Sequence, residues 1–267
     1  MSELITRAIT GAAYVALTLG AAWAGPFTTA MLFLPVCAIG AQEFHRLYWH
    51  DGQGPLPLWS VMLACTVYVT VAAGAFTNVW LPGYAVGLTF VLLLVGITMT
   101  LRRGAPAPAE EFAGQMLLVS YIALPFALLP HMLGNGPAEL ACTFILLWTN
   151  DTGAYLVGRS IGRTKLLPAV SSKKTIEGLL GGIALTLGVA WLLGSFWTDL
   201  SLQDRLVCGL LVSVSATLGD LLESAFKRAR GVKDSGNVLP GHGGILDRFD
   251  GFLLAIPAVY LYLHLLR

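Results

Sequence analysis

The chain has 267 residues, of which 56% are apolar and only 12% are charged. Soluble domains carry about 25% charged residues, so this chain has too little polar surface to cover a water-soluble globule. Its formal net charge of +1 also excludes the strong basic field with which proteins attract nucleic acids. The composition therefore predicts a polytopic membrane protein with no nucleic-acid partner.

Nine apolar windows of the sequence are long enough to form helices that cross the hydrocarbon core, which takes about 20 residues. They run over 5–24, 27–47, 58–77, 79–101, 112–132, 138–158, 176–196, 206–226 and 249–266. Ala22-Trp23-Ala24 resembles a weak signal-peptidase site. Because many apolar segments follow it, we expect the first window to remain as a transmembrane helix. The expected fold class is all-α, with about nine transmembrane helices.

The lysines and arginines indicate the orientation, since cytoplasmic loops of membrane proteins carry an excess of both. With a cytoplasmic N-terminus, the inward segments are 1–7, 45–57, 102–111, 159–175 and 227–250. These segments or their edges hold all 16 lysines and arginines except Arg205 and Arg267. The charge pattern therefore predicts that the N-terminus and the polar loops face the cytoplasm.

The polar motifs are confined to the second half of the chain. Residues 1–135 have short loops and no polar cluster inside an apolar window, so we expect them to form a transmembrane scaffold. Residues 136–267 contain every motif described below, so we expect them to form the catalytic domain.

The first motif is WTNDTGAYLVGR, residues 148–159, where Asn150 and Asp151 interrupt an apolar window. An ionisable side chain inside a membrane span costs about 2.5–3.5 kcal/mol on insertion scales, so it indicates a functional site. The alternative is a structural role in an interhelical hydrogen bond or in an ion pair between Asp151 and a lysine.

The second motif is SSKKTIEGLLGG, residues 171–182, where Lys173 and Lys174 stand directly before an expected helix. Helix N-termini bind phosphate through their free N–H groups, and neighbouring lysines add positive charge. The spacing is not that of a P-loop. The alternative is that both lysines are ordinary residues of a cytoplasmic loop. The glycines at 178, 181 and 182 predict close helix packing.

The third motif is LGDLLESAFKR, residues 218–228, where Asp220, Glu223 and Lys227 share one helical stripe. No charge occurs over residues 206–219, so Asp220 is expected below the membrane surface. Its solvation must come from a cavity, a cation or a buried partner. A local Glu223–Lys227 pair would leave Asp220 unexplained.

Asp247 and Asp250 stand three residues apart at the start of the last expected helix, after a glycine-rich loop. If the last two helices are neighbours, Asp220, Asp247 and Asp250 can converge at the cytoplasmic end. Carboxylates without histidine or cysteine partners suit a hard cation, Mg²⁺ rather than Zn²⁺. Flanking lysines and arginines suit the phosphates that such a cation bridges. The residues alone thus predict a metal–phosphate site within the membrane protein.

The stretch SAFKRARGVKDSGNVLPGHGGILDRFD, residues 224–250, resembles the signature of the phosphatidate cytidylyltransferases, also called CDP-diacylglycerol synthases. The upstream stretches NDTGAYLVGR and SSKKTIEG are similar to family segments in the same order. Similarity is strong over residues 150–252, whereas residues 1–140 resemble the family only in hydrophobicity. Ser172 and Ile176 replace the proline and tryptophan of many members, and neither change removes a charge.

The resemblance implies that CTP and phosphatidate react to give CDP-diacylglycerol and pyrophosphate, with Mg²⁺ as the cofactor and a second cation left open. It also implies a bacterial-type cytoplasmic (inner) membrane, with the active site facing the cytoplasm. The expected partners are CTP, phosphatidate and membrane lipid, and a homodimer is left open.

As a hypothesis, we assign the following roles to the polar residues of these motifs. The cation would be held by Asp220, Asp247 and Asp250, with Asp151 and Glu223 as further candidates, and Lys227 would act beside them. The phosphates of CTP or phosphatidate would be bound by Lys173, Lys174, Arg228, Lys233, His242, Gly243, Gly244, Arg248 and Asn150. The glycines would contribute backbone N–H groups, and His242 would shape the loop or contact phosphate.

Three other functions remain as alternatives. A CTP-dependent polyprenol or phytol kinase would release CDP rather than pyrophosphate. A CDP-alcohol phosphatidyltransferase would need D-G-x-x-A-R, but Phe252-Leu253-Leu254-Ala255 follow Asp250-Gly251. An ion-coupled transporter would also place acids within the membrane, but the internal repeat expected of one is missing from the sequence.

Overall fold

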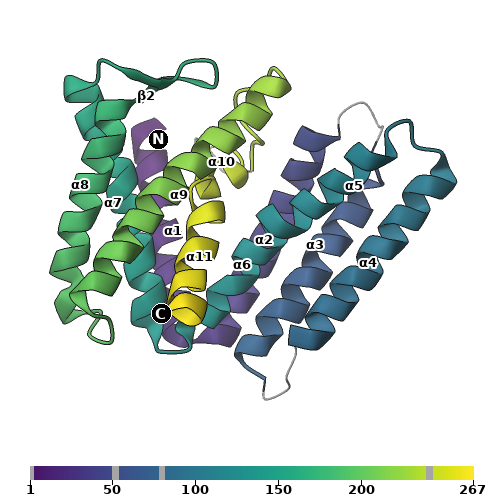
Figure 1. Cartoon of the computed structure of the whole chain (residues 1–267), viewed down its shortest axis with the longest axis horizontal. Coiled ribbons are helices and arrows are strands. Elements are labelled where there is room, and N and C mark those ends of the chain that lie inside the picture. Colours follow the sequence, from purple (N-terminus) through teal and green to yellow (C-terminus); the bar gives the residue numbers. More distant parts are fainter. Residues whose placement is uncertain (1–2, 50–53, 78–81, 239–242) are drawn as a thin grey trace. The chain divides into compact units, whose positions relative to one another are not determined.

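The computed structural model describes residues 3–49, 54–77, 82–238 and 243–267, and it consists mainly of helices (Figure 1). His242, a predicted site residue, lies outside these ranges. The chain divides into two compact units. The first contains Met1–Gly134 and Asp234–Arg248, and the second contains Asn135–Lys233 and Phe249–Arg267. The predicted division into scaffold and catalytic domain stays a prediction.

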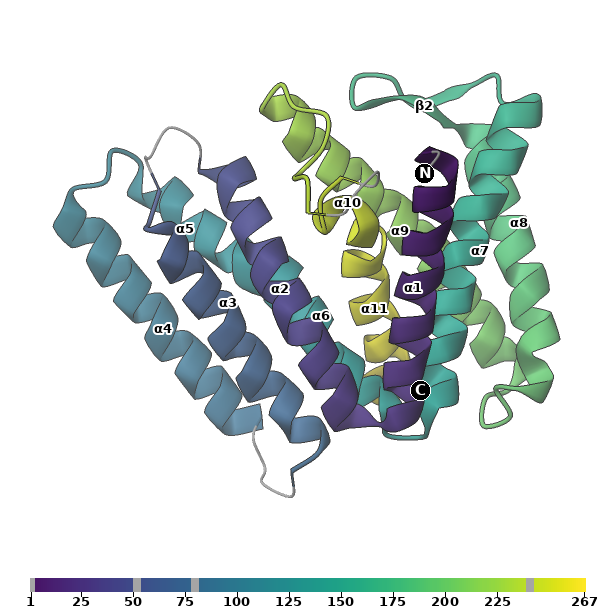
Figure 2. The ribbon, with the colours of Figure 1, turned by 180° about the vertical axis from the view of Figure 1, so that it is seen from behind.

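The first unit consists mainly of long helices, most of which lie side by side (Figure 2). Its elements are α1 (Glu3–Ala24), α2 (Pro26–Tyr48), α3 (Pro57–Ala72), α4 (Pro82–Arg103), α5 (Pro108–Leu117), α6 (Leu124–Leu128) and most of α10 (Leu246–Phe249). Proline begins several of them because its fixed φ suits the first helical position. Aromatic side chains fill the core, where Phe33 of α2 stacks on Phe126 of α6 with ring centroids 6.1 Å apart.

The second unit packs its helices around α9. Its elements are α7 (Pro137–Ile161), β1 (Lys165–Leu167), β2 (Ser171–Thr175), α8 (Ile176–Leu192), α9 (Leu202–Ala229) and α11 (Phe252–Leu261). The α7 and α8 backbones approach closely because glycines face the contact. A Cβ atom on Gly181 would lie 2.4 Å from Val157, so the close packing predicted for this glycine-rich segment is confirmed.

The predicted all-α class is wrong in one segment, where β1 and β2 form an antiparallel hairpin between α7 and α8. Gly162 ends α7, and the Glu177 carboxylate accepts hydrogen bonds from the backbone N–H groups of Arg163 and Thr164, each at 3.1 Å. These bonds fold the segment back onto α8. Lys173 and Lys174 therefore lie on a strand, and Thr175 caps α8 by accepting a hydrogen bond from Gly178.

Many of the helices are long and apolar enough to cross a membrane. Within the described ranges, six meet both criteria: Pro26–Tyr48, Pro57–Ala75, Val86–Arg103, Pro108–Leu133, Ile176–Ser195 and Leu202–Ala229. Gly11–Ala24 and Phe252–Leu266 are shorter apolar helices, and α7 coincides with the remaining predicted window. The chain is thus a mostly helical integral membrane protein, while the count of nine spans and their orientation stay predictions.

Gly219 of α9 packs directly against the turn that precedes α11. A Cβ atom at this position would lie 2.3 Å from the backbone oxygen of Asp250. We expect Gly219→Ala to lower the thermal unfolding temperature in detergent, because overpacking costs about 1–3 kcal/mol. Gly188→Ala on α8 is the control, since a Cβ atom there meets nothing within 4 Å. Equal unfolding temperatures for the two variants would contradict this packing.

Candidate functional site

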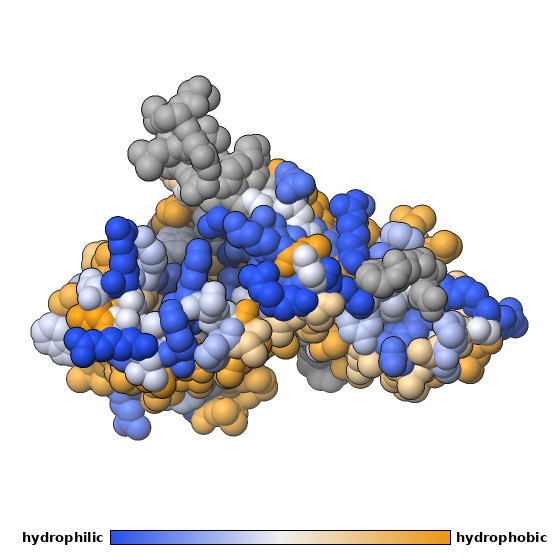
Figure 3. All heavy atoms as spheres, turned by 90° about the horizontal axis from the view of Figure 1, so that it is seen from above, coloured by the Kyte–Doolittle hydropathy of each residue, from blue (hydrophilic) through white to orange (hydrophobic). Residues whose placement is uncertain are grey.

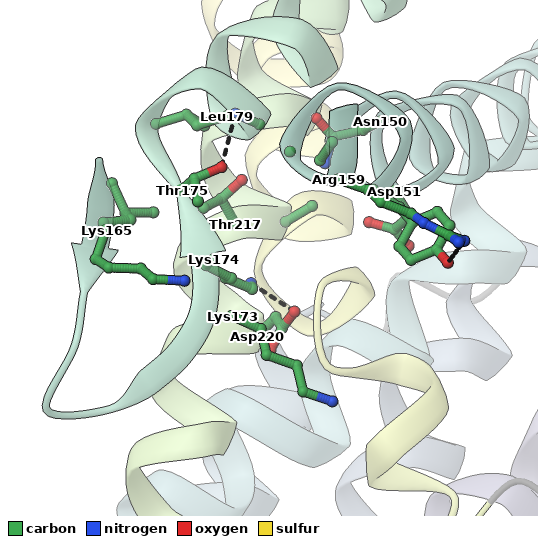
Figure 4. A pocket seen from close by; sticks show the side chains of 16 residues that line it. Asn150, Asp151, Arg159, Lys165, Lys173, Lys174, Thr175, Leu179, Thr217 and Asp220 are labelled. Carbon is green, nitrogen blue, oxygen red and sulfur yellow. Dashed lines mark hydrogen bonds and ion pairs between the residues drawn. The ribbon is translucent and has the colours of Figure 1, made fainter. Parts of the chain in front are cut away.

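A cavity of about 510 Å³ opens in the second unit between α7, the hairpin, α8 and α9 (Figure 4). Cavities of this size are typical of small-molecule sites. Its polar lining includes five of the charged residues from the motifs of this half of the chain. They are Asp151, Arg159, Lys173, Lys174 and Asp220, and Lys165 from between the motifs also lines the cavity. The cavity therefore offers both positive and negative charge to a ligand.

An ion pair across the cavity joins the hairpin to α9 (Figure 4). Lys174 Nζ lies 2.5 Å from Asp220 Oδ2, and the two side chains are 25% and 37% exposed. Ser224 also donates a hydrogen bond to Asp220 Oδ1 at 3.2 Å. The sequence predicts that a cavity, a cation or a buried partner solvates Asp220. In the structure, Asp220 lines a cavity and pairs with a lysine. The pair is accessible, so each partner can be exchanged for a ligand charge.

Further carboxylates gather near Asp220. Glu223 is 1% exposed and pairs with Lys227, with 2.5 Å between Oε2 and Nζ. Asp250 lies in the turn before the apolar helix Phe252–Leu266. The backbone oxygen of Asp250 lies against Gly219, the residue directly before Asp220. The structure therefore brings Asp220, Glu223 and Asp250 together, and lysines pair with the first two.

The donor set fits a Mg²⁺ ion that shares its coordination with a substrate. Over the described ranges, no three acidic, histidine or cysteine side chains are arranged to hold a metal by themselves. Mg²⁺ is commonly held by one or two carboxylates together with waters and substrate phosphates. Asp220 and Asp250 can supply those carboxylates, and the lysines of the hairpin can face the phosphates.

Asn150 and Arg159 extend the polar lining along α7 (Figure 4). Asn150 is buried, and its side-chain oxygen has no hydrogen-bond partner among the residues described. Arg159 donates a hydrogen bond to the Tyr155 hydroxyl at 2.9 Å. Sequence reasoning missed Tyr155, Arg159 and Lys165. The first two repeat Asp151 at intervals of four residues, a helical spacing that could have revealed them.

Asp247 belongs to the first unit, where it organises the glycine-rich loop. Its Oδ2 atom accepts hydrogen bonds from the Ser235 and Gly244 backbone N–H groups, each at 2.8 Å, and lies 3.0 Å from the Ser235 hydroxyl. Gly243 has φ = +84°, a conformation that favours glycine. The Gly244 amide is therefore used within the loop. The predicted convergence of Asp247 with Asp220 and Asp250 stays a prediction.

Glu43 of α2 is a second buried acid of the first unit, and sequence reasoning missed it. It is 2% exposed and accepts hydrogen bonds from loop residues Ser235, Ile245 and Leu246 at 2.9–3.0 Å. The signal was present, because an acid inside a predicted membrane span indicates function. The segment expected to be a plain scaffold therefore holds in place part of the glycine-rich loop, residues 234–248, which we name the signature loop.

The remaining predicted basic residues lie on the surface. Arg228, Lys233 and Arg248 are exposed, and Arg228 donates a hydrogen bond to the Val232 carbonyl at 3.1 Å. At the hairpin end of the second unit, hydrophilic side chains gather while apolar side chains line its flanks (Figure 3). The phosphate-binding roles of these three residues stay predictions.

Comparison of the sequence with known proteins identifies the family of this chain. The sequence profile described as "Cytidylyltransferase family" matches residues 5–266. The chain belongs to this cytidylyltransferase family. A phosphatidate cytidylyltransferase of Staphylococcus saprophyticus is 40% identical over 149 residues, or 55% of this chain and 57% of the relative. Those of Staphylococcus aureus (strain COL) and Staphylococcus haemolyticus are 41% identical over 150 residues, with the same coverage.

The match to the cytidylyltransferase family covers both units of the chain, including α2 with Glu43. The alignments to the individual relatives span little more than half the length of each, 57%. Membership of the family agrees with the resemblance of the signature loop. The cavity and the loop contain most of the residues predicted for the site.

Lys174 and its neighbour Lys173 allow a matched test of the ion pair. Lys174→Met removes the positive charge that pairs with Asp220, which then lies beside Asp250 without a lysine. We expect the free energy of unfolding to fall by up to about 1 kcal/mol, because the pair is partly exposed. Lys173→Met is the control, because Lys173 is exposed on the same strand. Thermal unfolding in detergent measures both, and added Asp220→Asn should restore part of the loss. Identical unfolding temperatures in both single variants would contradict the pairing.

Proposed function

We propose that the chain transfers the cytidylyl group of CTP to phosphatidate, giving CDP-diacylglycerol and pyrophosphate. Family membership and the names of the relatives support this proposal. The observation that carries it is the cavity in which Lys174 faces Asp220, close to Asp250. Such a cavity combines positive charge for phosphates with carboxylates for a cation.

The reaction needs little acid–base chemistry from the protein. A phosphate monoester has a second pKa near 6, so the phosphatidate oxygen is already anionic at neutral pH. That oxygen attacks the α-phosphorus of CTP, and the bond from this phosphorus to the oxygen that bridges it to the β-phosphorus breaks. The electron pair leaves with pyrophosphate. The main difficulty is bringing two polyanions together in line, so positioning and charge neutralisation dominate.

The residues of the cavity can supply both positioning and charge neutralisation. Lys165, Lys173 and Lys174 can hold the triphosphate and stabilise the leaving pyrophosphate. Asp220 and Asp250 would hold Mg²⁺, with Asp151 and Glu223 beside them. When bound, the ion would polarise the phosphoryl oxygens and neutralise their charge. Asn150 Oδ1 is a buried acceptor that a polar ligand group could satisfy.

The proposed location follows from the same features. CTP is soluble and phosphatidate is a membrane lipid, so the cavity must be open to both phases. Leu166, Leu179 and Ala216 line it together with the charged residues. The charge bias of the loops and the bacterial origin of the relatives support a bacterial-type inner membrane, with the cavity facing the cytoplasm.

A labelling experiment tests the reaction. Purified protein in detergent–phosphatidate micelles with Mg²⁺ is given CTP labelled at either the α- or the γ-phosphate. We expect α-label in the lipid fraction and γ-label in pyrophosphate. Label from the γ-position in lipid would instead support the lipid-kinase alternative. An unlabelled lipid fraction in both reactions would remove the proposal and reopen the transporter alternative.

Substitution of the two acids tests their role in the same assay. We expect Asp220→Asn and Asp250→Asn to lower the rate by about 100-fold or more, as is typical when a group that stabilises transition-state charge is lost. Asp199→Asn is the control, since Asp199 is an exposed acid between α8 and α9. Wild-type rates in both site variants would rule out the assignment of these acids.

A further inference from the structure

Glu43 is a buried carboxylate that none of the steps above uses. It lies on α2, is 2% exposed, and within the described chain forms no ion pair with lysine, arginine or histidine. Burying a charged carboxylate is costly unless hydrogen bonds replace the lost water. Those hydrogen bonds all come from one segment of the first unit, the signature loop.

The contacts of Glu43 define a cradle of backbone donors. Oε1 accepts a hydrogen bond from Ile245 N at 3.0 Å, and Oε2 accepts one from Leu246 N at 2.9 Å. The Ser235 hydroxyl lies 3.0 Å from Oε2. Hydrogen bonds to a charged acceptor are about twice as strong as neutral ones. Glu43 therefore fixes both sides of the loop, at residue 235 and at residues 245–246.

Two glycines make room for this carboxylate. A Cβ atom on Gly236 would lie 2.4 Å from Glu43 Oε1, and one on Gly244 would lie 2.6 Å from Glu43 Oε2. Real Cβ contacts are not that close. The glycines of the loop therefore serve the approach of an acid side chain as well as backbone flexibility.

Ser235 connects Glu43 to Asp247. Its hydroxyl lies 3.0 Å from Glu43 Oε2 and 3.0 Å from Asp247 Oδ2. A hydroxyl has one hydrogen to donate, so it can serve only one of the two carboxylates at a time. Leu246, which Glu43 holds by its N–H group, is also the residue directly before Asp247. Movement of Glu43 would thus move Asp247 through the hydroxyl and through the backbone.

We propose that Glu43 is a positioning residue for the cytidylyl transfer, acting through the backbone of 244–247 and through Asp247. This inference rests on the proposed function. A glutamine at this position would keep the shape but would present an N–H₂ group to one of two N–H donors. One donor would be left buried and unsatisfied, so the loop would leave its present conformation.

The first test combines Glu43→Gln with Asp247→Asn. We expect Glu43→Gln to lower kcat by about 10–100-fold, the range found for groups that orient a reacting site through another residue. In the residual activity of Asp247→Asn, adding Glu43→Gln should cause little further loss, because both act on one element. Multiplied losses in the double variant would overturn the proposal.

Glu111→Gln is the matched control. Glu111 is a buried acid of the same unit, 4% exposed, and it accepts hydrogen bonds from Thr100 and Arg103 away from the loop. If Glu43 merely stabilised the unit, the two variants would lose activity in proportion to their lowered unfolding temperatures. A specific loss of kcat in Glu43→Gln is the expected result.

Hydrogen exchange separates this inference from the proposed function. We expect peptides over 243–248 to exchange faster in Glu43→Gln than in wild type or Glu111→Gln, whatever reaction the protein catalyses. Unchanged exchange would overturn the positioning role even if the enzyme uses CTP. If Glu43→Gln does not fold, Ser235→Ala removes only the hydroxyl that lies 3.0 Å from both Glu43 and Asp247 and keeps the backbone contacts of Glu43, and it should show the same non-additivity with Asp247→Asn on a smaller scale.

Discussion

A carboxylate in an apolar helical protein must be solvated by the protein itself, and this constraint shapes both units of the chain. Water is scarce among the helices, so each acid needs a cation or a set of N–H and O–H donors. Asp220 obtains Lys174, and Glu223 obtains Lys227. Glu43 obtains two backbone amides and a hydroxyl from the signature loop. The positions of the hairpin and the loop follow from these requirements.

The two kinds of solvation lead to different chemistry. An acid that faces a lysine in an open cavity can trade that lysine for a metal ion, while the lysine turns to a phosphate. The ligand then satisfies both charges without any change in the backbone. An acid held by peptide N–H groups has no such freedom, because releasing it would break the loop that surrounds it. The Lys174–Asp220 pair is thus suited to exchange, and Glu43 is suited to fixing a shape.

The sequence predicts those parts of the fold and the site whose physical causes lie within a short stretch of the chain. The apolar windows coincide with observed helices because length and hydropathy are local properties, and α7 and α8 approach as Gly181 predicts. The hairpin was missed because its fold depends on Glu177 accepting hydrogen bonds from residues 13 and 14 positions away. Glu43 and Ser235 are 192 residues apart, so no spacing rule relates them. The apolar context of Asp220 marks it as a functional residue in the sequence. The sequence does not identify Lys174 as its partner, because it leaves a cavity, a cation and a buried partner as equal sources of solvation.

The contact of Gly219 with the backbone oxygen of Asp250 has a mechanical consequence. With no side chain between them, the α9 backbone and the turn before α11 pack in direct contact. Asp220 is the next residue along α9, so a rotation of that helix about its axis would carry both acids together.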